Sequence, residues 1–163
     1  LKELNHPELD AFIEWAGQGV NLRFIELMET GENRPYFDKH HLSGDVLVKK
    51  LDEGGWLEVP RDALGGPARV WKHPKMAGSV GLIAPYSKDF CTTCNRLRVS
   101  ARGGLHLCLF GDGGHDLRPF LQKDSDKSRL KETICELLDL KVAGHGLHEH
   151  DTGATPHFAS IGG

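Results

Sequence analysis

The apolar positions of the first 60 residues change from helical spacing to strand spacing. Apolar residues at positions 9, 12, 13 and 16 lie on one helix face, after a capping asparagine and a proline. Glycines at positions 17 and 19 end this predicted helix, and the short apolar run at residues 20–28 predicts a strand. A helix and a strand joined by a short glycine loop indicate the αβ half of a βαβ unit.

The following residues predict a loop, a second helix and more strands. Residues 29–42 are polar and predict a loop. Ser43 then caps a second predicted helix, which a pair of glycines at positions 54 and 55 ends. Short apolar runs predict three further strands, at residues 56–59, 68–72 and 80–84.

The second half of the chain predicts a hairpin, two helices and a tail. Residues 97–100 and 105–109 are strand-like, and the glycines between them supply a turn. We expect a short helix over residues 116–121 and a longer one over residues 127–142. The apolar face of the longer helix carries Leu130, Ile134, Leu137 and Leu138. Residues 145–163 are polar and glycine-rich without periodicity, so we expect an extended tail.

Composition and charge narrow the class of protein. A chain of 163 residues with 39% hydrophobic and 26% charged residues is typical of a soluble globular domain. The net charge of −3 excludes a strongly basic nucleic-acid-binding protein. No apolar run approaches the roughly 20 residues of a membrane span and no signal peptide is visible, so we expect a cytoplasmic protein. The chain begins at Leu1, directly ahead of a helix signal, which we interpret as a piece of a longer protein.

Three of the four cysteines are close together in the sequence. Cys91 and Cys94 form a Cys-x-x-Cys pair, and Cys108 follows after 13 residues in the second strand of the predicted hairpin. The loop lets two thiolates hold one metal centre, and the hairpin brings the third within reach. In a reducing compartment this spacing favours a metal site over a disulfide framework. Cys135 lies next to Ile134 on the last predicted helix, and we interpret it as a packed thiol.

The spacing alone leaves two kinds of metal site open. Three cysteines do not complete the tetrahedron of a structural zinc site, but His106 or His115 would supply a fourth ligand. A [4Fe–4S] cluster held by three thiolates would instead leave one iron open for a substrate atom. Cysteines packed in a core without any metal are the third and least specific interpretation.

Two arginines follow the second cysteine directly. On a strand, Arg96 and Arg98 point the same way, and two guanidiniums side by side form a clamp suited to phosphate or carboxylate. A solvated strand face is the alternative, but the position beside metal ligands favours the clamp. If the site instead holds zinc, these two arginines and Arg102 would contact a nucleic-acid backbone, which makes the chain a zinc-stapled binding module.

Longer strings around these residues resemble one known family. The similarity is to the GTP 3′,8-cyclases, radical SAM enzymes of molybdenum cofactor biosynthesis, at residues 89–100, 105–111, 23–28 and 161–163. The resemblance is collinear and covers essentially the whole chain. It implies an α/β fold that is the carboxy-terminal portion of an incomplete (αβ)6 barrel, followed by a cluster-binding extension with a β-hairpin and a helix. Residues 1–60 would then be the last αβ units of the barrel and residues 61–163 the cluster- and GTP-binding region.

The family's chemistry implies two [4Fe–4S] clusters in the full-length enzyme. One cluster, on an N-terminal Cys-x3-Cys-x2-Cys loop, cleaves S-adenosylmethionine to a 5′-deoxyadenosyl radical. The radical removes the C3′ hydrogen of GTP, and C3′ then attacks C8 to give (8S)-3′,8-cyclo-7,8-dihydroguanosine 5′-triphosphate. Cyclic pyranopterin monophosphate synthase is the implied partner downstream, and neither a membrane nor a nucleic acid is expected as a partner. The resemblance also suggests a homodimer.

The family's functional residues carry over by position. The resemblance implies that Cys91, Cys94 and Cys108 hold the second cluster, whose open iron would bind the guanine ring. It assigns GTP binding to the segment Arg96, Leu97 and Arg98, and a catalytic role to both arginines. It assigns contact with S-adenosylmethionine to Met28, with Arg23 as a further candidate.

The two ends of the chain bear on activity. Gly162 and Gly163 match a double-glycine tail that reaches the family's active site and takes part in catalysis, although composition alone predicts a disordered end. No Cys-x3-Cys-x2-Cys motif occurs in this chain. We therefore expect the chain alone to lack cyclase activity.

Overall fold

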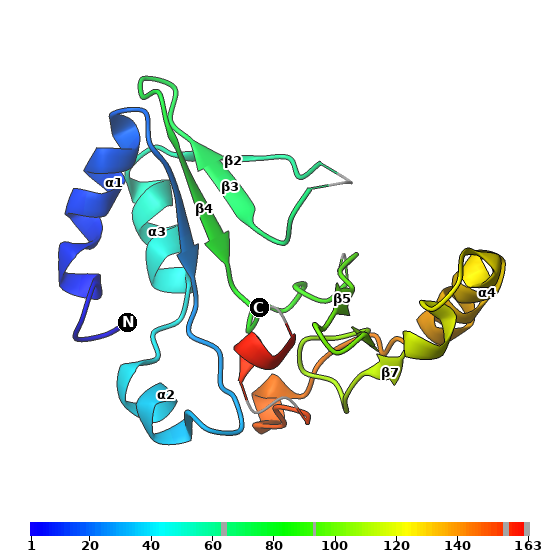
Figure 1. Cartoon of the computed structure of the whole chain (residues 1–163). Helices are drawn as coiled ribbons and strands as arrows, with labels where there is room; N and C mark the ends of the chain where they lie inside the picture. The colour runs from blue at the N-terminus through cyan, green and yellow to red at the C-terminus, as the bar shows by residue number, and fades with distance from the viewer. Residues whose placement is uncertain (63–64, 93, 155–156, 162–163) are drawn as a thin grey trace. The chain divides into compact units, whose positions relative to one another are not determined.

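The computed structural model describes residues 1–62, 65–92, 94–154 and 157–161, in two compact units (Figure 1). The first unit comprises Leu1–Met28 and Pro35–Thr93, and the second comprises Glu29–Arg34 and Cys94–Gly163. Both units contain helices and strands, which confirms the mixed α/β class. The family resemblance implies a boundary between residues 60 and 61. The sheet of the first unit includes strands on both sides of that boundary. In the described ranges, no helix is long and apolar enough to cross a membrane.

The first unit is built on a four-stranded sheet in the order β1-β4-β3-β2 (Figure 1). β1 (Asn21–Ile25) pairs in parallel with β4 (Ser79–Ile83). β3 (Arg69–Lys72) pairs antiparallel with β4 on one side and with β2 (Leu57–Val59) on the other. These bounds confirm, to within a few residues, the four strands predicted in this part of the sequence. The strands could be predicted because each contains a short apolar run bounded by turn residues.

Two helices bury their apolar faces in the core of this unit. α1 (Leu9–Gly17) follows a short 3-10 turn, η1 (His6–Glu8), and α3 (Asp45–Glu53) precedes β2. The buried residues of this core are Leu9, Ala16, Leu47, Leu51, Trp56, Trp71, Val80, Leu82 and Ala84. α1 supplies Leu9 and Ala16, two of the positions whose helical spacing predicted it, and α3 supplies Leu47 and Leu51, four residues apart.

The start of α3 differs from the prediction that Ser43 caps it. Gly44 occupies the N-cap, and Ser43 lies one residue earlier, where its Oγ accepts the N–H of Asp45 at 3.2 Å. A β-carbon at residue 44 would lie 2.9 Å from Leu82 Cδ2 and 3.2 Å from Ala84 Cβ. The close approach of β4 therefore favours glycine at the cap, and the serine acts from the preceding position.

The loop predicted over residues 29–42 is wrong in part, because it contains the helix α2 (Arg34–His40). Pro35 lies in its first turn, where a missing N–H costs little. Phe37 and His40 are its buried residues. A seven-residue helix with one buried aromatic side chain has too few apolar positions to show a helical period. The polar composition therefore hid this helix.

The second unit contains a three-stranded antiparallel sheet in the order β5-β6-β7. β5 (Arg98–Val99) and β6 (Gly104–His106) form the predicted hairpin, and β7 (His115–Asp116) extends it. A 3-10 turn, η2 (Arg118–Phe120), stands where we predict a helix over residues 116–121. The hairpin is confirmed, and the short helix is reduced to one turn.

The long helix α4 (Lys127–Leu138) packs on this sheet after a 3-10 turn, η3 (Asp124–Asp126). Its packed residues and their partners are Leu130, Ile134 and Leu137 against Leu105, Leu107 and Leu117. The helix ends at residue 138, although we predict an end near residue 142. Leu138 is 40% exposed and Cys135 is also exposed, so placing these two side chains on the packed face is wrong.

The described part of the carboxy-terminal tail is folded, which corrects the prediction of an extended segment. It contains two 3-10 turns, η4 (Leu147–Glu149) and η5 (Phe158–Ile161), each with one buried residue. Gly153 adopts a φ of 64°, and a β-carbon there would lie 2.4 Å from the backbone oxygen of Phe110. This segment is held by one buried apolar residue in each turn and by one close glycine contact. Such isolated contacts produce no periodic pattern in the sequence, so the sequence could not predict the turns. Gly162 and Gly163 lie outside the described residues.

Candidate functional site

Cys91 lies in a turn of the first unit that follows β4. The Phe90 N–H donates to the Ser87 oxygen at 3.2 Å, and Thr92 Oγ1 donates to the Asp89 oxygen at 2.8 Å. The Cys91 side chain is half-buried. Local hydrogen bonds therefore shape the turn that carries the first cysteine.

Cys108 lies in the second unit, two residues beyond the end of β6. The prediction that it stands on a strand is therefore wrong, because the β6 ladder ends at His106. The half-buried Cys108 Sγ accepts the N–H of Phe110 at 3.5 Å. Hydrogen bonds to sulfur stabilise a thiolate, and they tune the potential of iron–sulfur clusters. The Cys108 side chain thus accepts one backbone N–H within its own loop.

The loop around Cys108 is held on both sides. The preceding residue, Leu107, is buried in the core of the second unit. On the other side, the Phe110 ring lies 5.1 Å from the His145 ring and 5.8 Å from the Phe158 ring, both edge-on. The Ala154 N–H donates to the Gly111 oxygen at 3.0 Å. The folded tail therefore packs directly on the loop that carries Cys108.

Cys94 is half-buried at the start of a segment without regular structure. β5 begins only at Arg98, so strand alternation does not apply to Arg96 as the sequence analysis assumed. Arg96 is exposed, Leu97 is 38% exposed and Arg98 is half-buried on β5. Whether the two guanidiniums act as one clamp stays a prediction.

The three cysteines are divided between the two units of the structure. Within the part of the chain described, no group of three His, Cys, Asp or Glu side chains is placed to hold a metal ion. Cys91 belongs to the first unit, and Cys94 and Cys108 belong to the second. All are half-buried thiols, and thiolates are the ligands that both zinc and iron–sulfur clusters use. The donor chemistry fits such a group, and the ligation itself stays a prediction.

Arg23 and Met28 lie on and just beyond β1 in the first unit. Arg23 Nη1 donates to the Leu22 oxygen at 2.9 Å and to Ser79 Oγ at 3.5 Å. A β-carbon at residue 81 would lie 2.5 Å from Arg23 Cδ, so glycine at this position makes room for the arginine side chain. Met28 is half-buried, three residues beyond the carboxyl end of β1. Contact with S-adenosylmethionine stays a prediction for both residues.

A hydrogen-bonded pair of a buried glutamate and a half-buried histidine, which the sequence analysis missed, lies at the same end of β1. Glu26 is buried, and His41 Nε2 lies 2.8 Å from its Oε1. The His41 ring stacks on Phe37 at 4.5 Å and meets Tyr86 edge-on at 5.1 Å. Glu26 directly follows the strand and His41 is one of two adjacent histidines, which are the signals that could have found the pair.

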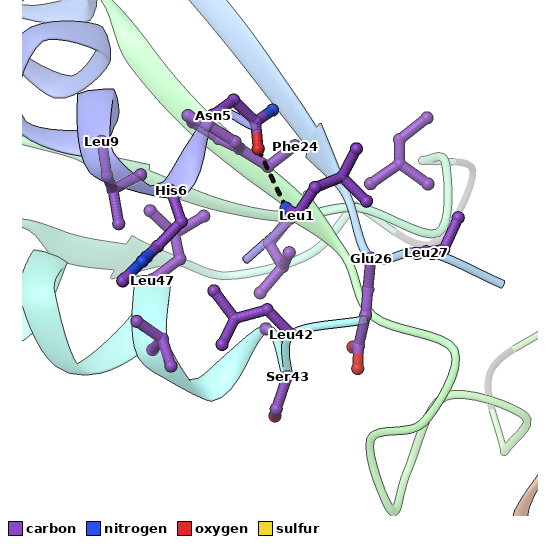
Figure 2. Close-up of a pocket in the computed structure, with 14 residues that line it drawn as sticks. Leu1, Asn5, His6, Leu9, Phe24, Glu26, Leu27, Leu42, Ser43 and Leu47 are labelled. Atoms are coloured by element: carbon purple, nitrogen blue, oxygen red, sulfur yellow. Dashed lines mark hydrogen bonds between the residues drawn. The ribbon is translucent and has the colours of Figure 1, made fainter. Parts of the chain in front are cut away.

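Glu26 also lines a small cavity near the carboxyl end of β1, with Leu27, Leu42 and Ser43 around it (Figure 2). The cavity measures about 60 Å³. Sites for small molecules typically measure about 300–1,000 Å³, so this cavity is too small for a nucleotide. The volume of this cavity therefore does not support a nucleotide site here.

A second missed cluster lies within the second unit. The Glu29 side chain is 5% exposed, and Arg34 Nη1 donates to its Oε1 at 2.9 Å. His150 Nδ1 lies 2.7 Å from Oε2 of the same carboxylate. His150 has a left-handed backbone with a φ of 61°. The glutamate thus ties residues 29–34 to the tail across 121 sequence positions, which no local pattern can indicate.

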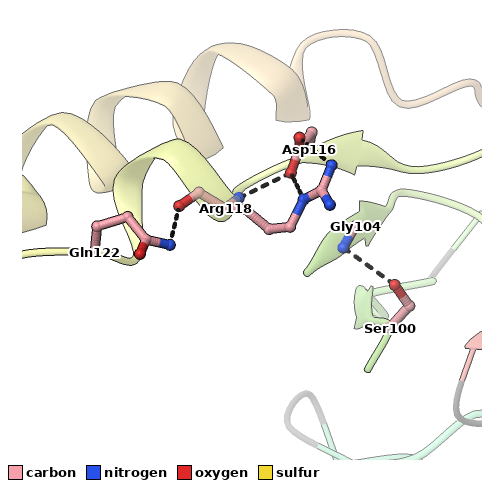
Figure 3. Close-up of polar contacts among 5 residues, drawn as sticks. All are labelled: Ser100, Gly104, Asp116, Arg118 and Gln122. Atoms are coloured by element: carbon pink, nitrogen blue, oxygen red, sulfur yellow. Dashed lines mark hydrogen bonds and ion pairs between the residues drawn. The ribbon is translucent and has the colours of Figure 1, made fainter. Parts of the chain in front are cut away.

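The exposed pair of Asp116 and Arg118 follows the hairpin (Figure 3). Asp116 Oδ1 accepts the Arg118 backbone N–H and Nε–H, each at 2.9 Å, and Oδ2 accepts Nη2 at 2.8 Å. These hydrogen bonds stabilise the carboxylate and lower the pKa of Asp116 to about 2. Ser100 Oγ accepts the Gly104 N–H at 3.1 Å and closes the hairpin turn nearby.

Replacing Arg118 with alanine should raise the pKa of Asp116 from about 2 towards the ordinary value of about 3.9. The side-chain bonds are lost and the backbone bond remains, so the return should be partial. Because the pKa is lowered in the fold, the pair stabilises the protein above the ordinary pKa, and this contribution fades as the pH falls towards 2. NMR titration of the carboxyl carbon measures the change. Arg102→Ala, at an exposed arginine, is the control, and an unchanged pKa in Arg118→Ala would contradict the assignment.

The sequence of the chain is similar to one protein family and to several known proteins. Residues 20–147 match the model of a family described as Molybdenum Cofactor Synthesis C. The chain is 54% identical over 164 aligned residues to a protein of Stenotrophomonas maltophilia (strain K279a) named GTP 3′,8-cyclase. Proteins of the same name from Vibrio parahaemolyticus and Aeromonas hydrophila are 52% and 53% identical. Each match covers 100% of this chain and 48–50% of the relative, so the chain spans about half the length of these curated relatives.

Proposed function

Because the chain belongs to the Molybdenum Cofactor Synthesis C family, we propose that it is the carboxy-terminal half of an enzyme that cyclises GTP in molybdenum cofactor biosynthesis. The observation that carries this proposal is identity of 52–54% over the whole chain to proteins named GTP 3′,8-cyclase. Since the chain spans about half of each relative, the activity is that of the longer protein.

The proposed contribution of this half is an iron–sulfur cluster beside the nucleotide. Cys91, Cys94 and Cys108 would hold it as thiolates. When bound, a [4Fe–4S] cluster with three thiolate ligands supplies one open iron for an atom of the guanine ring. The half-burial of all three thiols and the Phe110 N–H bonded to Cys108 Sγ support this assignment.

The proposed role of Arg96, Leu97 and Arg98 is to bind and orient GTP. Guanidinium groups bind phosphate through paired, charge-assisted hydrogen bonds, and an arginine keeps its charge at any physiological pH. Arg98 lies on β5 in register with His106, which gives its backbone a fixed position. Arg96, two residues after Cys94, is exposed and accessible to a ligand.

The remaining assignments concern the ends of the chain. Met28, with Arg23, would contact S-adenosylmethionine, and Gly162 and Gly163 would act at the nucleotide. The packing of Phe158 against Phe110 supports a role for the tail beside the Cys108 loop. The second cluster, the homodimer and the downstream partner, cyclic pyranopterin monophosphate synthase, are proposed for the longer protein.

The test compares the full-length protein with this chain alone, both reconstituted anaerobically with iron and sulfide. The full-length protein should convert GTP and S-adenosylmethionine to the cyclised nucleotide, measured by chromatography. The chain alone should form no product, because it lacks a Cys-x3-Cys-x2-Cys motif for the radical-generating cluster.

Two outcomes would contradict this proposal. Product formed by the chain alone would show that it needs no second half. A full-length protein that forms no product, stays colourless and binds one zinc would instead favour the zinc-stapled nucleic-acid-binding module.

A further inference from the structure

A lysine beyond the last helix joins the two segments that carry the cysteines of the second unit. Lys141 Nζ donates to the backbone oxygen of Arg96 at 3.3 Å and also to the backbone oxygen of Leu107. Arg96 lies two residues after Cys94, and Leu107 directly precedes Cys108. One ammonium group therefore links both cysteine segments, across 45 and 34 sequence positions.

The lysine is itself held in place by the end of α4. The Leu140 N–H donates to the Leu137 oxygen, and the Lys141 N–H donates to the Leu138 oxygen, each at 3.0 Å. Leu137 packs on the cluster of buried residues that includes Leu107. The backbone of Lys141 is thus fixed relative to the Cys108 segment before the side chain makes any bond.

The two accepting carbonyls lie just outside the β5–β6 ladder. This ladder ends at the pair of Arg98 and His106, so Leu107 is the first residue beyond it on one strand and Arg96 is the second residue beyond it on the other. An ammonium carries three N–H donors and no acceptor, and its bonds to carbonyl oxygens are charge-assisted. Lys141 therefore adds a cross-link between the two segments just beyond the hairpin ladder, on the side of the cysteines.

We propose that Lys141 is a positioning residue for the iron–sulfur site, where it sets the spacing between the Cys94 and Cys108 segments. The inference rests on the proposed function, since it takes both cysteines as ligands of one cluster. The hairpin pairs and the packing of α4 persist without the ammonium. Loss of Lys141 should therefore weaken retention of the cluster without unfolding the unit.

The experiment uses the full-length protein, reconstituted anaerobically with iron and sulfide. Cys94→Ser defines the share of bound iron that belongs to this site. Lys141→Met removes the charge and keeps an unbranched side chain, Lys141→Arg restores donors, and Lys131→Met removes an exposed charge from α4 as a matched control. The measurements are iron and sulfide per protein, the rate at which a chelator removes the site's iron, and the thermal unfolding midpoint.

Lys141→Met should lose the site's iron about tenfold faster than the unmodified protein, which is the lower end of the 10–100-fold effect of residues that support metal ligands. Lys141→Arg should return to within about threefold of the unmodified rate, because a guanidinium also donates to two carbonyls. Lys131→Met should match the unmodified protein. The unfolding midpoints of all three lysine variants should agree.

The outcomes separate this inference from the proposed function. If Cys94→Ser keeps all its iron, the proposed cluster site is wrong. If Cys94→Ser loses its share while Lys141→Met releases iron at the unmodified rate, the cluster site stands and the positioning role is overturned. A lowered unfolding midpoint in Lys141→Met without rescue by arginine would show a role in general stability, and would also overturn the inference.

Discussion

Cys108→Ser in the full-length protein should abolish GTP cyclisation and remove one cluster's share of iron. A serine hydroxyl is a hard, weakly acidic donor, whereas iron in clusters is held by soft thiolates. We expect turnover to fall by more than about 100-fold, beyond the loss typical of residues that only support metal ligands. Iron analysis and chromatography of the cyclised nucleotide measure both effects.

The matched control is Cys135→Ser. Cys135 lies exposed on α4, and the substitution makes the same chemical change. Iron content and turnover should stay at the unmodified values. Equal losses in both variants would point to a general effect of the serine substitution, and an active Cys108→Ser with full iron content would rule out Cys108 as a ligand.

The regular elements could be predicted because each carries a periodic signal in a few consecutive residues. The face of α1 shows Leu9 and Ala16 at helical spacing, and β4 is a continuous apolar run between turn residues. Burial of that face or run is what stabilises the element, so the pattern and the cause are the same.

The elements that were missed depend on single contacts. α2 has Phe37 as its one buried apolar side chain, and the tail is anchored by Leu147 and Ile161. A lone apolar residue in a polar segment has no period, and its partner is decided by the tertiary fold. Such segments are typically predicted as loops from sequence alone.

The candidate site shows the same division. Cys91, Cys94 and Cys108 could be proposed as ligands because ligand spacing and a family resemblance are visible in the sequence. Lys141 and Glu29 were not found, because each acts through groups far along the chain, two of them backbone carbonyls. Backbone carbonyls are present at every residue, so no sequence pattern singles out the pair that a lysine will reach.

The second unit concentrates its anchors around one loop. Leu107 holds the loop before Cys108 through the apolar core, and Phe110 holds it afterwards through two rings from the tail. Lys141 adds a polar bond at the same place. Three unrelated kinds of contact thus restrict the position of one thiol, which is what a rigid metal ligand requires.

Trp71→Ala should destabilise the first unit by about 3–5 kcal/mol, the usual cost of emptying a large aromatic site in a core. Trp71 is 1% exposed on β3, in register with Val80 of β4. Its ring is part of the core that α1 and α3 cover, so its loss leaves a cavity below both helices. Urea unfolding of the chain, followed by circular dichroism, measures the change in the free energy of unfolding.

Trp15→Ala is the matched control for this substitution. Trp15 lies on α1 and is 50% exposed, so its removal creates no cavity, and alanine favours the helix. We expect its effect to stay below about 1 kcal/mol. If both tryptophans cost the same free energy, the sheet and its two helices do not share the core described above. A large loss of stability in Trp71→Ala and a small one in Trp15→Ala is the result expected if β3 faces α1 and α3. In that arrangement the indole of Trp71 is enclosed in the core and the indole of Trp15 is exposed to water.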